Sequence, residues 1–167
     1  MSLRHVDPLA PRGPAYRVYA WLVGTRPMGW LSRKVGWQLD PWLARLSGGR
    51  VGLGLMLPTA LLQSRGARSG ALRRTVAIYF HDGERVTLVA SKLGMPSNPA
   101  WFYNVRAHPD VVFGGAPFVA EVVSDPAELA RLWPLADRVF PGYRGYRERA
   151  ARAGREIPLV QLVPSPR

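Results

Sequence analysis

The sequence predicts a mainly antiparallel α+β fold, and two strand pairs with intervening helices support this prediction. Residues 73–80 and 85–91 are rich in β-branched and aromatic side chains, and the Asp-Gly step between them is typical of a hairpin. Residues 110–113 and 117–124 form a second pair that turns at two glycines. Helix start signals follow each pair, so hairpins and helices alternate along the chain.

Length and composition limit the possible classes of protein. The chain has 167 residues, which is enough for one domain with a core of its own. Lys and Arg outnumber Asp and Glu by 23 to 11, and the net charge of +12 favours an anionic partner. There is no cysteine, so disulfides, thiolate metal sites and cysteine nucleophiles are excluded and a cytoplasmic location is expected.

Residues 1–50 precede the predicted strands and divide into two segments. Residues 1–13 contain prolines and a glycine without apolar periodicity, which predicts a mobile tail. Residues 14–50 show an interrupted helical pattern in which four of the six tryptophans alternate with basic residues. This segment either packs as an amphipathic helix on its own domain or makes a peripheral contact with the cytoplasmic face of a membrane. Residues 51–167 then form the ligand-binding domain, and no apolar run is long enough to span a bilayer.

Start and stop signals define the remaining elements up to the second hairpin. The apolar run over residues 51–62 leads into a strand that ends near Ser64. Asn98 stands before Pro99, which predicts an N-cap with proline at the first helical position. The helix should continue to about Ala107.

The last third of the chain predicts two more helical segments and one strand. Residues 125–128 have capping-box spacing, which indicates the start of a helix that ends at the Pro141-Gly142 pair. A short segment over residues 143–153 and a final strand over residues 157–163 complete the fold.

A basic glycine-rich loop follows the first strand. Four arginines occur within ten residues here, without a carboxylate among them. Glycines allow backbone N–H groups to turn toward an anion, and guanidinium groups can each hold two of its oxygens. The alternative is a solvated basic turn, because the glycine spacing is not that of a P-loop. The candidate anion-binding residues are Arg65, Gly66, Arg68, Ser69, Gly70 and Arg73.

A second candidate segment, residues 90–98, runs from a strand end through a glycine turn to a helix N-terminus. Free N–H groups at such a terminus can bind an anionic or carbonyl group. Ser91 and Lys92 are placed to face a ligand, whereas Asn98 has a sufficient structural role as the N-cap.

The sequence offers no sign of metal or triad chemistry. The three histidines are far apart and lack ligand spacing, and no Gly-x-Ser-x-Gly motif occurs. Phe140, Tyr143 and Tyr146 recur every three residues, so they either line a pocket rim, where a hydroxyl could orient an acceptor, or pack in the core. The arginines nearby are expected to form a solvated face: Arg144, Arg147, Arg149, Arg152 and Arg155.

From about Leu57 to Pro164 the chain resembles the actinobacterial deazaflavin-dependent nitroreductase and quinone reductase family, whose members use coenzyme F-420. The family's fold is a split β-barrel with flanking helices, similar to that of FMN-binding proteins. The motifs that carry the resemblance are Gly66-Ala67-Arg68-Ser69-Gly70 with Arg73, Val89-Ala90-Ser91-Lys92, Asn98-Pro99-Ala100-Trp101 with Asn104, and Pro141-Gly142-Tyr143 through Arg155-Glu156-Ile157-Pro158.

The resemblance implies a role for each motif. Arg68 and Arg73 would hold the phosphate and polyglutamate tail of the coenzyme. Tyr143 and Tyr146 would line the substrate side, where Ser91 is also placed near the reacting groups. The more buried part of the cofactor site would be formed by Ala90, Ser91, Lys92, Met95, Pro96, Asn98 and Trp101. Hydride would pass from the reduced deazaflavin to a hydrophobic acceptor such as a quinone, a nitroaromatic compound or an activated enone.

The chain departs from the family pattern at two positions. Ala67 replaces a second basic residue of the loop, and Phe140 replaces a tyrosine found in some relatives. The alternatives to this function are an FMN- or haem-binding protein of the same fold, or a basic membrane-surface module without catalysis. Nucleic acid is not an expected partner, because no recognisable binding motif is present.

Overall fold

The computed structural model describes residues 3–24 and 57–165. Within these residues six antiparallel strands close into one barrel, in the order β1-β2-β3-β6-β5-β4. The strands are β1 (Thr59–Arg65), β2 (Leu72–Asp82), β3 (Arg85–Val89), β4 (Asp110–Phe113), β5 (Ala116–Val122) and β6 (Leu159–Pro164). The predicted mainly antiparallel α+β split barrel is confirmed.

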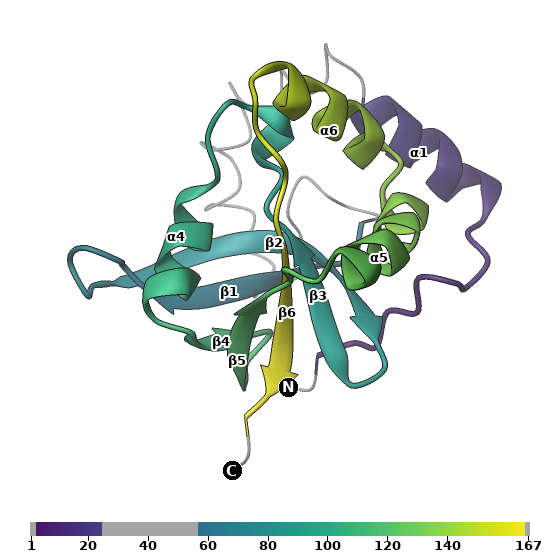
Figure 1. The fold of residues 1–167 in the computed structure, drawn as a ribbon. Coiled ribbons are helices and arrows are strands. Elements are labelled where there is room, and N and C mark those ends of the chain that lie inside the picture. The colour runs from purple at the N-terminus through teal and green to yellow at the C-terminus, as the bar shows by residue number, and fades with distance from the viewer. Residues whose placement is uncertain (1–2, 25–56, 166–167) are drawn as a thin grey trace.

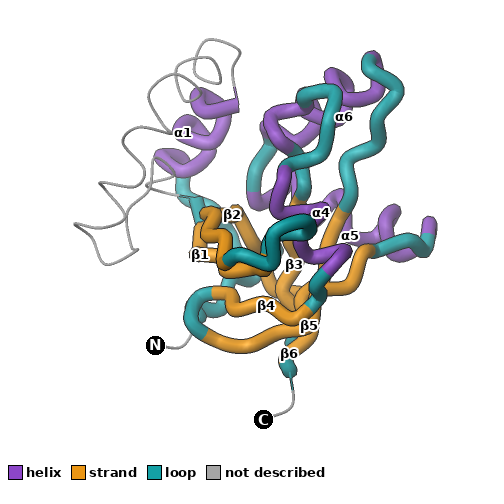
Figure 2. The backbone as a smooth tube through the Cα atoms, turned by 90° about the vertical axis from the view of Figure 1, so that its left-hand side faces the viewer, coloured by secondary structure: helices purple, strands orange, loops and turns teal. Residues whose placement is uncertain are grey.

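Four α-helices and one short 3-10 turn accompany the described strands. They are α1 (Pro14–Gly24), the turn η2 (Lys92–Gly94), α4 (Ala100–Ala107), α5 (Pro126–Val139) and α6 (Gly142–Arg152). Figure 1 shows α1, α5 and α6 as a group beside the barrel, and both α1 and α5 contact α6. The view in Figure 2 shows α1 and α6 standing above the strands. The helix α4 lies apart from them, against β1 and β5.

Both predicted hairpins are present. In the first, Asp82 pairs with Arg85 across a turn in which Gly83 has a φ of 61°. That left-handed conformation is one that glycine adopts without a steric penalty, which explains the Asp-Gly signal. In the second, Phe113 pairs with Ala116. The barrel closes where β1 pairs with β4 and β3 pairs with β6.

Alternating apolar residues of the strands fill the barrel. Leu62, Leu88, Phe113 and Leu162 are fully buried and come from four different strands. Each such side chain contributes about 1.5–3 kcal/mol relative to an exposed one. The barrel is therefore a packed core, and any ligand site must lie on its outside.

The start of α5 agrees with the sequence, but its capping box is incomplete. The side chain of Asp125 accepts a hydrogen bond from the backbone N–H of Ala127 at 3.1 Å, as an N-cap does. Glu128 does not complete the box; it forms an ion pair with Arg131 instead.

The predicted cap of α4 is wrong. Pro99 occupies the N-cap position, with no side-chain hydrogen bond to the helix. The side chain of Asn98 instead accepts a hydrogen bond from Nε of Arg155 at 2.7 Å. Asn98 is thus structural, as expected, but it joins two distant segments and does not cap a helix.

Residues 3–13, for which we expected a mobile tail, lie against the barrel. Val6 is buried, and its backbone N–H donates to Nδ1 of His81 at 3.0 Å. The hydroxyl of Tyr79 donates to the carbonyl of Arg4 at 2.8 Å. This segment therefore adds a short covering layer over the end of β2.

Only the first part of the Trp/Arg-rich segment can be described. In α1 the hydroxyl of Tyr16 donates to the carbonyl of Val139, and Ala20 is fully buried. Residues 25–50, which carry most of the tryptophans of this segment, lie outside the described residues. No helix in the described ranges is long and apolar enough to cross a membrane.

Candidate functional site

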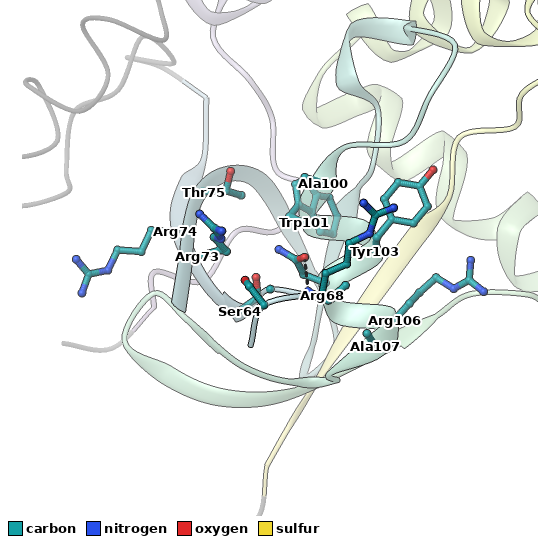
Figure 3. Close-up of a pocket in the computed structure, with 14 residues that line it drawn as sticks. Ser64, Arg68, Arg73, Arg74, Thr75, Ala100, Trp101, Tyr103, Arg106 and Ala107 are labelled. Atoms are coloured by element: carbon teal, nitrogen blue, oxygen red, sulfur yellow. Dashed lines mark hydrogen bonds between the residues drawn. The ribbon is translucent and has the colours of Figure 1, made fainter. Parts of the chain in front are cut away.

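A pocket of about 1050 Å³ lies between the β1–β2 loop and α4. The loop projects at the left of Figure 1, beside α4, and Figure 3 shows the residues around the pocket. The lining residues are Ser64, Gly66, Ala67, Arg68, Ser69, Arg73, Arg74, Thr75, Ala100, Trp101, Tyr103, Asn104, Arg106 and Ala107.

The loop of this pocket closes on itself and depends on glycine at position 70. The N–H of Gly66 donates to the carbonyl of Ala71, and the N–H of Gly70 donates to the carbonyl of Gly66, both at 2.8 Å. Gly70 has a φ of 66°. A Cβ atom on Gly66 would lie 2.8 Å from Oγ of Ser69, an exposed hydroxyl that can rotate away. The loop therefore closes on itself in a form that a side chain at position 70 would strain.

Asn104 fastens this loop to α4. Its Oδ1 accepts a hydrogen bond from the backbone N–H of Ala67 at 3.0 Å, drawn as a dashed line in Figure 3. Asn104 is buried, with 9% of its surface exposed. Since a buried amide needs partners, the contact defines how the loop sits on the helix.

The charge of the pocket is uncompensated. Four exposed arginines line it: Arg68, Arg73, Arg74 and Arg106. In the described part of the chain no carboxylate forms an ion pair with any of them. In Figure 3 Arg74 extends away from Trp101, whereas Arg68 lies over the pocket. Such an arrangement favours a ligand with several negative charges.

One face of α4 supplies the opposite wall. Ala100, Tyr103, Asn104 and Ala107 follow helical spacing, and all four line the pocket. Trp101 is half-buried and Tyr103 is 46% exposed, so the wall also offers aromatic surface. The pocket thus combines cationic side chains with flat apolar ones.

The segment 90–98 has an unusual backbone. Lys92 and Leu93 have φ values of 44° and 57°, and Gly94 follows at 74°. Positive φ in two successive residues with side chains costs energy and persists only where other contacts enforce it. Nζ of Lys92 donates to Oγ of Ser97 at 2.7 Å, which closes the segment on itself.

Helix α6 packs tightly against this turn. A Cβ atom on Gly94 would lie 2.5 Å from the carbonyl oxygen of Tyr146. The guanidinium of Arg149 donates to the carbonyl of Leu93 from both Nε and Nη2, each at 3.2 Å. The turn therefore fits α6 only because residue 94 has no side chain.

Three of the arginines predicted to be solvated, Arg147, Arg149 and Arg155, form contacts with other parts of the fold. Arg155 is buried, with 9% exposed surface, and donates hydrogen bonds into the segment 90–98. Arg147 pairs with Asp137 at 2.8 Å and lies over the ring of Trp133 at 4.1 Å. The prediction of a solvated face is wrong at these positions, because a spacing pattern does not reveal that a guanidinium meets a carboxylate or backbone carbonyls from elsewhere in the chain.

Tyr143 and Tyr146 do not form a rim of this pocket. Only 2% and 4% of their surfaces are exposed, and both rings make edge contacts with Phe140. Burial raises the pKa of the Tyr143 hydroxyl far above its ordinary value. Of the two interpretations left open by the sequence, core packing describes what the structure shows for this cluster.

The pocket includes some of the predicted cofactor residues and not others. It is lined by Gly66, Arg68, Ser69, Arg73 and Trp101. It is not lined by Arg65, Gly70, Ala90, Ser91, Lys92, Met95, Pro96 or Asn98. Sequence reasoning had not assigned a role to Tyr103 or Arg106, although the helical spacing from Ala100 to Ala107 was a usable signal. Among the described residues, no three His, Cys, Asp or Glu side chains gather in a way that could hold a metal ion.

The basic pocket lies beside a glycine loop on the outside of a six-stranded split barrel. The F420H(2)-dependent quinone reductase family matches residues 38–164. The chain belongs to this family. The predicted family and coenzyme F-420 as its cofactor are thereby confirmed.

Individual proteins are also similar to this chain. An F420H(2)-dependent quinone reductase of Mycobacterium tuberculosis is 34% identical over 144 residues, which cover 80% of this chain and 95% of that protein. A solved F420-H2 dependent reductase is 29% identical, covering 63% of this chain and 93% of its own, with a TM-score of 0.55. A second solved structure, described as a domain-swapped dimer, is 26% identical and covers 81% of this chain and 98% of its own, with a TM-score of 0.56.

Proposed function

We propose that this protein is an F420H(2)-dependent quinone reductase whose coenzyme binds along the basic pocket and the segment 90–98. The observation that carries the proposal is the anchored glycine loop with unpaired arginines, in a chain of this family. When bound, the reduced deazaflavin supplies a hydride. Transfer of this hydride would reduce a quinone by two electrons, and one proton from solvent would complete the hydroquinone.

The pocket fits the anionic part of the coenzyme. Arg68 lies in the loop that Asn104 holds against α4, and Arg73 lies in β2 just after that loop; both line the pocket. Their guanidinium groups have no competing carboxylate among the described residues, so phosphate and glutamate carboxylates can take up their donors. Arg106, at the α4 end of the pocket, extends the same cationic surface.

We place the ring system of the coenzyme against the segment 90–98. Ala90 is buried where β3 ends, and Ser91 is half-buried where the unusual turn begins. Met95 and Pro96 are exposed apolar residues after that turn, and they offer a surface to a planar ring. What supports this placement is that the segment is closed by Lys92 and leads into the α4 wall of the pocket.

We propose that the acceptor substrate also binds beside the segment 90–98. Of the residues predicted to lie near the reacting groups, Ser91 is the one that is partly exposed. In our proposal Tyr143 and Tyr146 act by packing behind the 92–94 turn and do not present hydroxyls to the acceptor, since both are buried. A quinone is the acceptor expected from the family, and nitroaromatics or activated enones are the alternatives to test.

A coenzyme titration tests the proposal. The purified protein should quench the fluorescence of oxidised coenzyme F-420 and oxidise its reduced form in the presence of a quinone. Arg68→Ala and Arg73→Ala should each weaken binding by about 1.5–3 kcal/mol, or roughly 10- to 150-fold. Arg138→Ala, on the exposed side of α5 and outside the pocket, is the matched control. Binding that is unchanged in both pocket variants would remove the assignment of the loop.

The same purification tests the FMN alternative. A yellow chromophore that remains with the protein, together with no affinity for coenzyme F-420, would support an FMN protein of this fold. A haem would show itself by a Soret band in the same spectrum.

We also propose, from the sequence alone, that residues 14–50 give the protein peripheral contact with a membrane where hydrophobic quinones reside. The support is the alternation of tryptophans with basic residues and the net charge of +12. Flotation with anionic liposomes tests this, using Arg26 and Lys34 changed together to Glu. We expect lost flotation with unchanged coenzyme binding. Flotation that the double variant retains would contradict the proposal.

A further inference from the structure

The guanidinium of Arg155 donates four hydrogen bonds to the segment 90–98, although Arg155 comes from a distant part of the chain. Its Nε donates to Oδ1 of Asn98 at 2.7 Å. Its Nη2 donates to the carbonyl of Ala90 at 2.5 Å, and its Nη1 donates to those of Met95 at 2.5 Å and Ser91 at 3.3 Å. All four acceptors belong to one short stretch of the chain, and three of them are backbone carbonyls.

These contacts satisfy groups that have few other partners. The segment leaves β3 after Val89 and, apart from the short η2 turn, is not regular again until Ala100. Buried carbonyl groups in such a stretch must find donors elsewhere. One planar guanidinium supplies them to both ends and the middle of the segment, which a single-point donor cannot do.

The position of Arg155 in the fold explains its reach. It lies just after α6, where the chain returns toward β6 along the side of the molecule that faces the viewer in Figure 1. The neighbouring Ala90 is tied to the same returning chain, because its backbone N–H donates to the carbonyl of Pro158 at 3.0 Å. Arg155 therefore connects the end of β3, the η2 turn and the entry to α4.

The charge of Arg155 is not balanced by a carboxylate. Within the described ranges no ion pair to Arg155 is formed, and its hydrogen-bond acceptors are all neutral. Burial lowers its pKa, yet a guanidinium remains protonated at neutral pH. A buried cation without a paired carboxylate is costly, and the four hydrogen bonds of Arg155 to the segment 90–98 offset part of that cost.

We propose that Arg155 is a positioning residue that holds the segment 90–98 in the form the coenzyme's ring system requires. It acts through the backbone of that segment, whereas Arg68 and Arg73 act on the ligand directly. This inference rests on the proposed function, because it assigns the segment to the same coenzyme. Affinity for the coenzyme would then depend on Arg155 as well as on the arginines of the basic pocket.

The shape of the side chain makes a specific comparison possible. Arg155→Lys keeps the charge but presents one ammonium group, which cannot reach both Ala90 and Asn98 in the same way. Arg155→Met keeps the length and removes every donor. Arg152→Met is the matched control, since Arg152 is an exposed arginine on the last turn of α6.

Hydrogen exchange of the ligand-free protein tests the positioning role without any coenzyme. In Arg155→Met and Arg155→Lys we expect faster amide exchange in residues 90–98, with β2 and β3 as protected as in the wild type. Arg152→Met should exchange as the wild type does. Unchanged exchange in 90–98, or an equal rise in every strand, would overturn the inference. If Arg155→Met does not fold, Arg155→Lys and Asn98→Ala make the same comparison.

A coenzyme titration at several salt concentrations separates this inference from the proposed function. Arg155→Lys should weaken binding at least tenfold while keeping the wild-type salt dependence, because the ionic contacts to the tail are intact. Arg68→Ala should weaken binding and also reduce its salt dependence. If the wild type does not bind the coenzyme, the proposed function fails. If the wild type binds and Arg155→Lys binds equally well, the inference alone fails.

Discussion

Asn104 accepts a hydrogen bond from the backbone N–H of Ala67, and this contact sets the glycine loop against α4. Asn104→Ala would leave that N–H without its partner and cost about 0.5–1.5 kcal/mol of stability. We expect coenzyme binding to weaken as well, because the loop that carries Arg68 loses its anchor. Denaturant unfolding and a coenzyme titration of the same sample measure the two effects.

Asn104→Asp is the informative comparison. It keeps an acceptor for Ala67 but adds a negative charge beside the pocket arginines. Stability should stay near that of the wild type while binding of the anionic coenzyme falls. Equal losses of stability in both variants would contradict the role given to the acceptor.

Gly94 should be intolerant of any side chain. It combines a φ of 74° with a close approach to the carbonyl of Tyr146. Gly154 has a similar φ of 65°, but nothing lies within 4 Å of its added Cβ. Gly154→Ala should therefore cost about 1–2 kcal/mol from the backbone alone, and Gly94→Ala clearly more. Thermal or denaturant unfolding of the two variants measures the difference, and equal losses would contradict the tight fit of η2 on α6.

The stability of the N-terminal contact should depend on pH through His81. Its Nδ1 accepts the N–H of Val6, and its ring lies 4.4 Å from that of His5. Burial lowers the pKa of His81, and the neighbouring His5 lowers it further. The unfolded chain therefore binds the proton first, so this contribution is present above pH 6.5 and is lost as the pH falls below that value.

His81→Gln provides the control, since its amide oxygen can still accept from Val6 without titrating. The denaturant midpoint of the wild type should fall more than that of His81→Gln between pH 8 and pH 5. Parallel curves for the two proteins would show that His81 does not carry the effect.

Tyr143→Phe should leave the turnover of bound coenzyme nearly unchanged. A general acid typically contributes about 10²-fold or more to a rate, so removing a hydroxyl that acts in that way would lower the turnover by a similar factor. Tyr143 is fully buried and its pKa is raised, which argues against such use. Tyr143→Ala should instead destabilise the fold by about 3 kcal/mol or more through the lost packing. Single-turnover rates and unfolding curves distinguish the two roles.

The sequence predicted the barrel well where local signals are strong. The Asp-Gly and Gly-Gly turns fixed both hairpins, and the register across Asp82 and Arg85 follows from the first of them. The closing pairs between β1 and β4 and between β3 and β6 could not be predicted from residue patterns, because they join strands far apart in the chain. The split barrel came from the family resemblance.

The site was predicted unevenly for a related reason. The glycine loop was found because its arginines are adjacent in sequence. Arg155 was assigned to solvent, since its acceptors lie 57 to 65 residues away and three of them are backbone carbonyls. Asn98 was misassigned for the same reason: a cap is a local motif, and the actual partner is not local.

The unpaired arginines around the pocket also have a consequence for the protein without its ligand. Like charges held close together repel one another, so the empty form carries an internal electrostatic strain that dissolved ions reduce. Moderate salt should then raise the stability of the ligand-free protein and lower its affinity for the coenzyme. The same cluster thus sets opposite responses to ionic strength before and after binding.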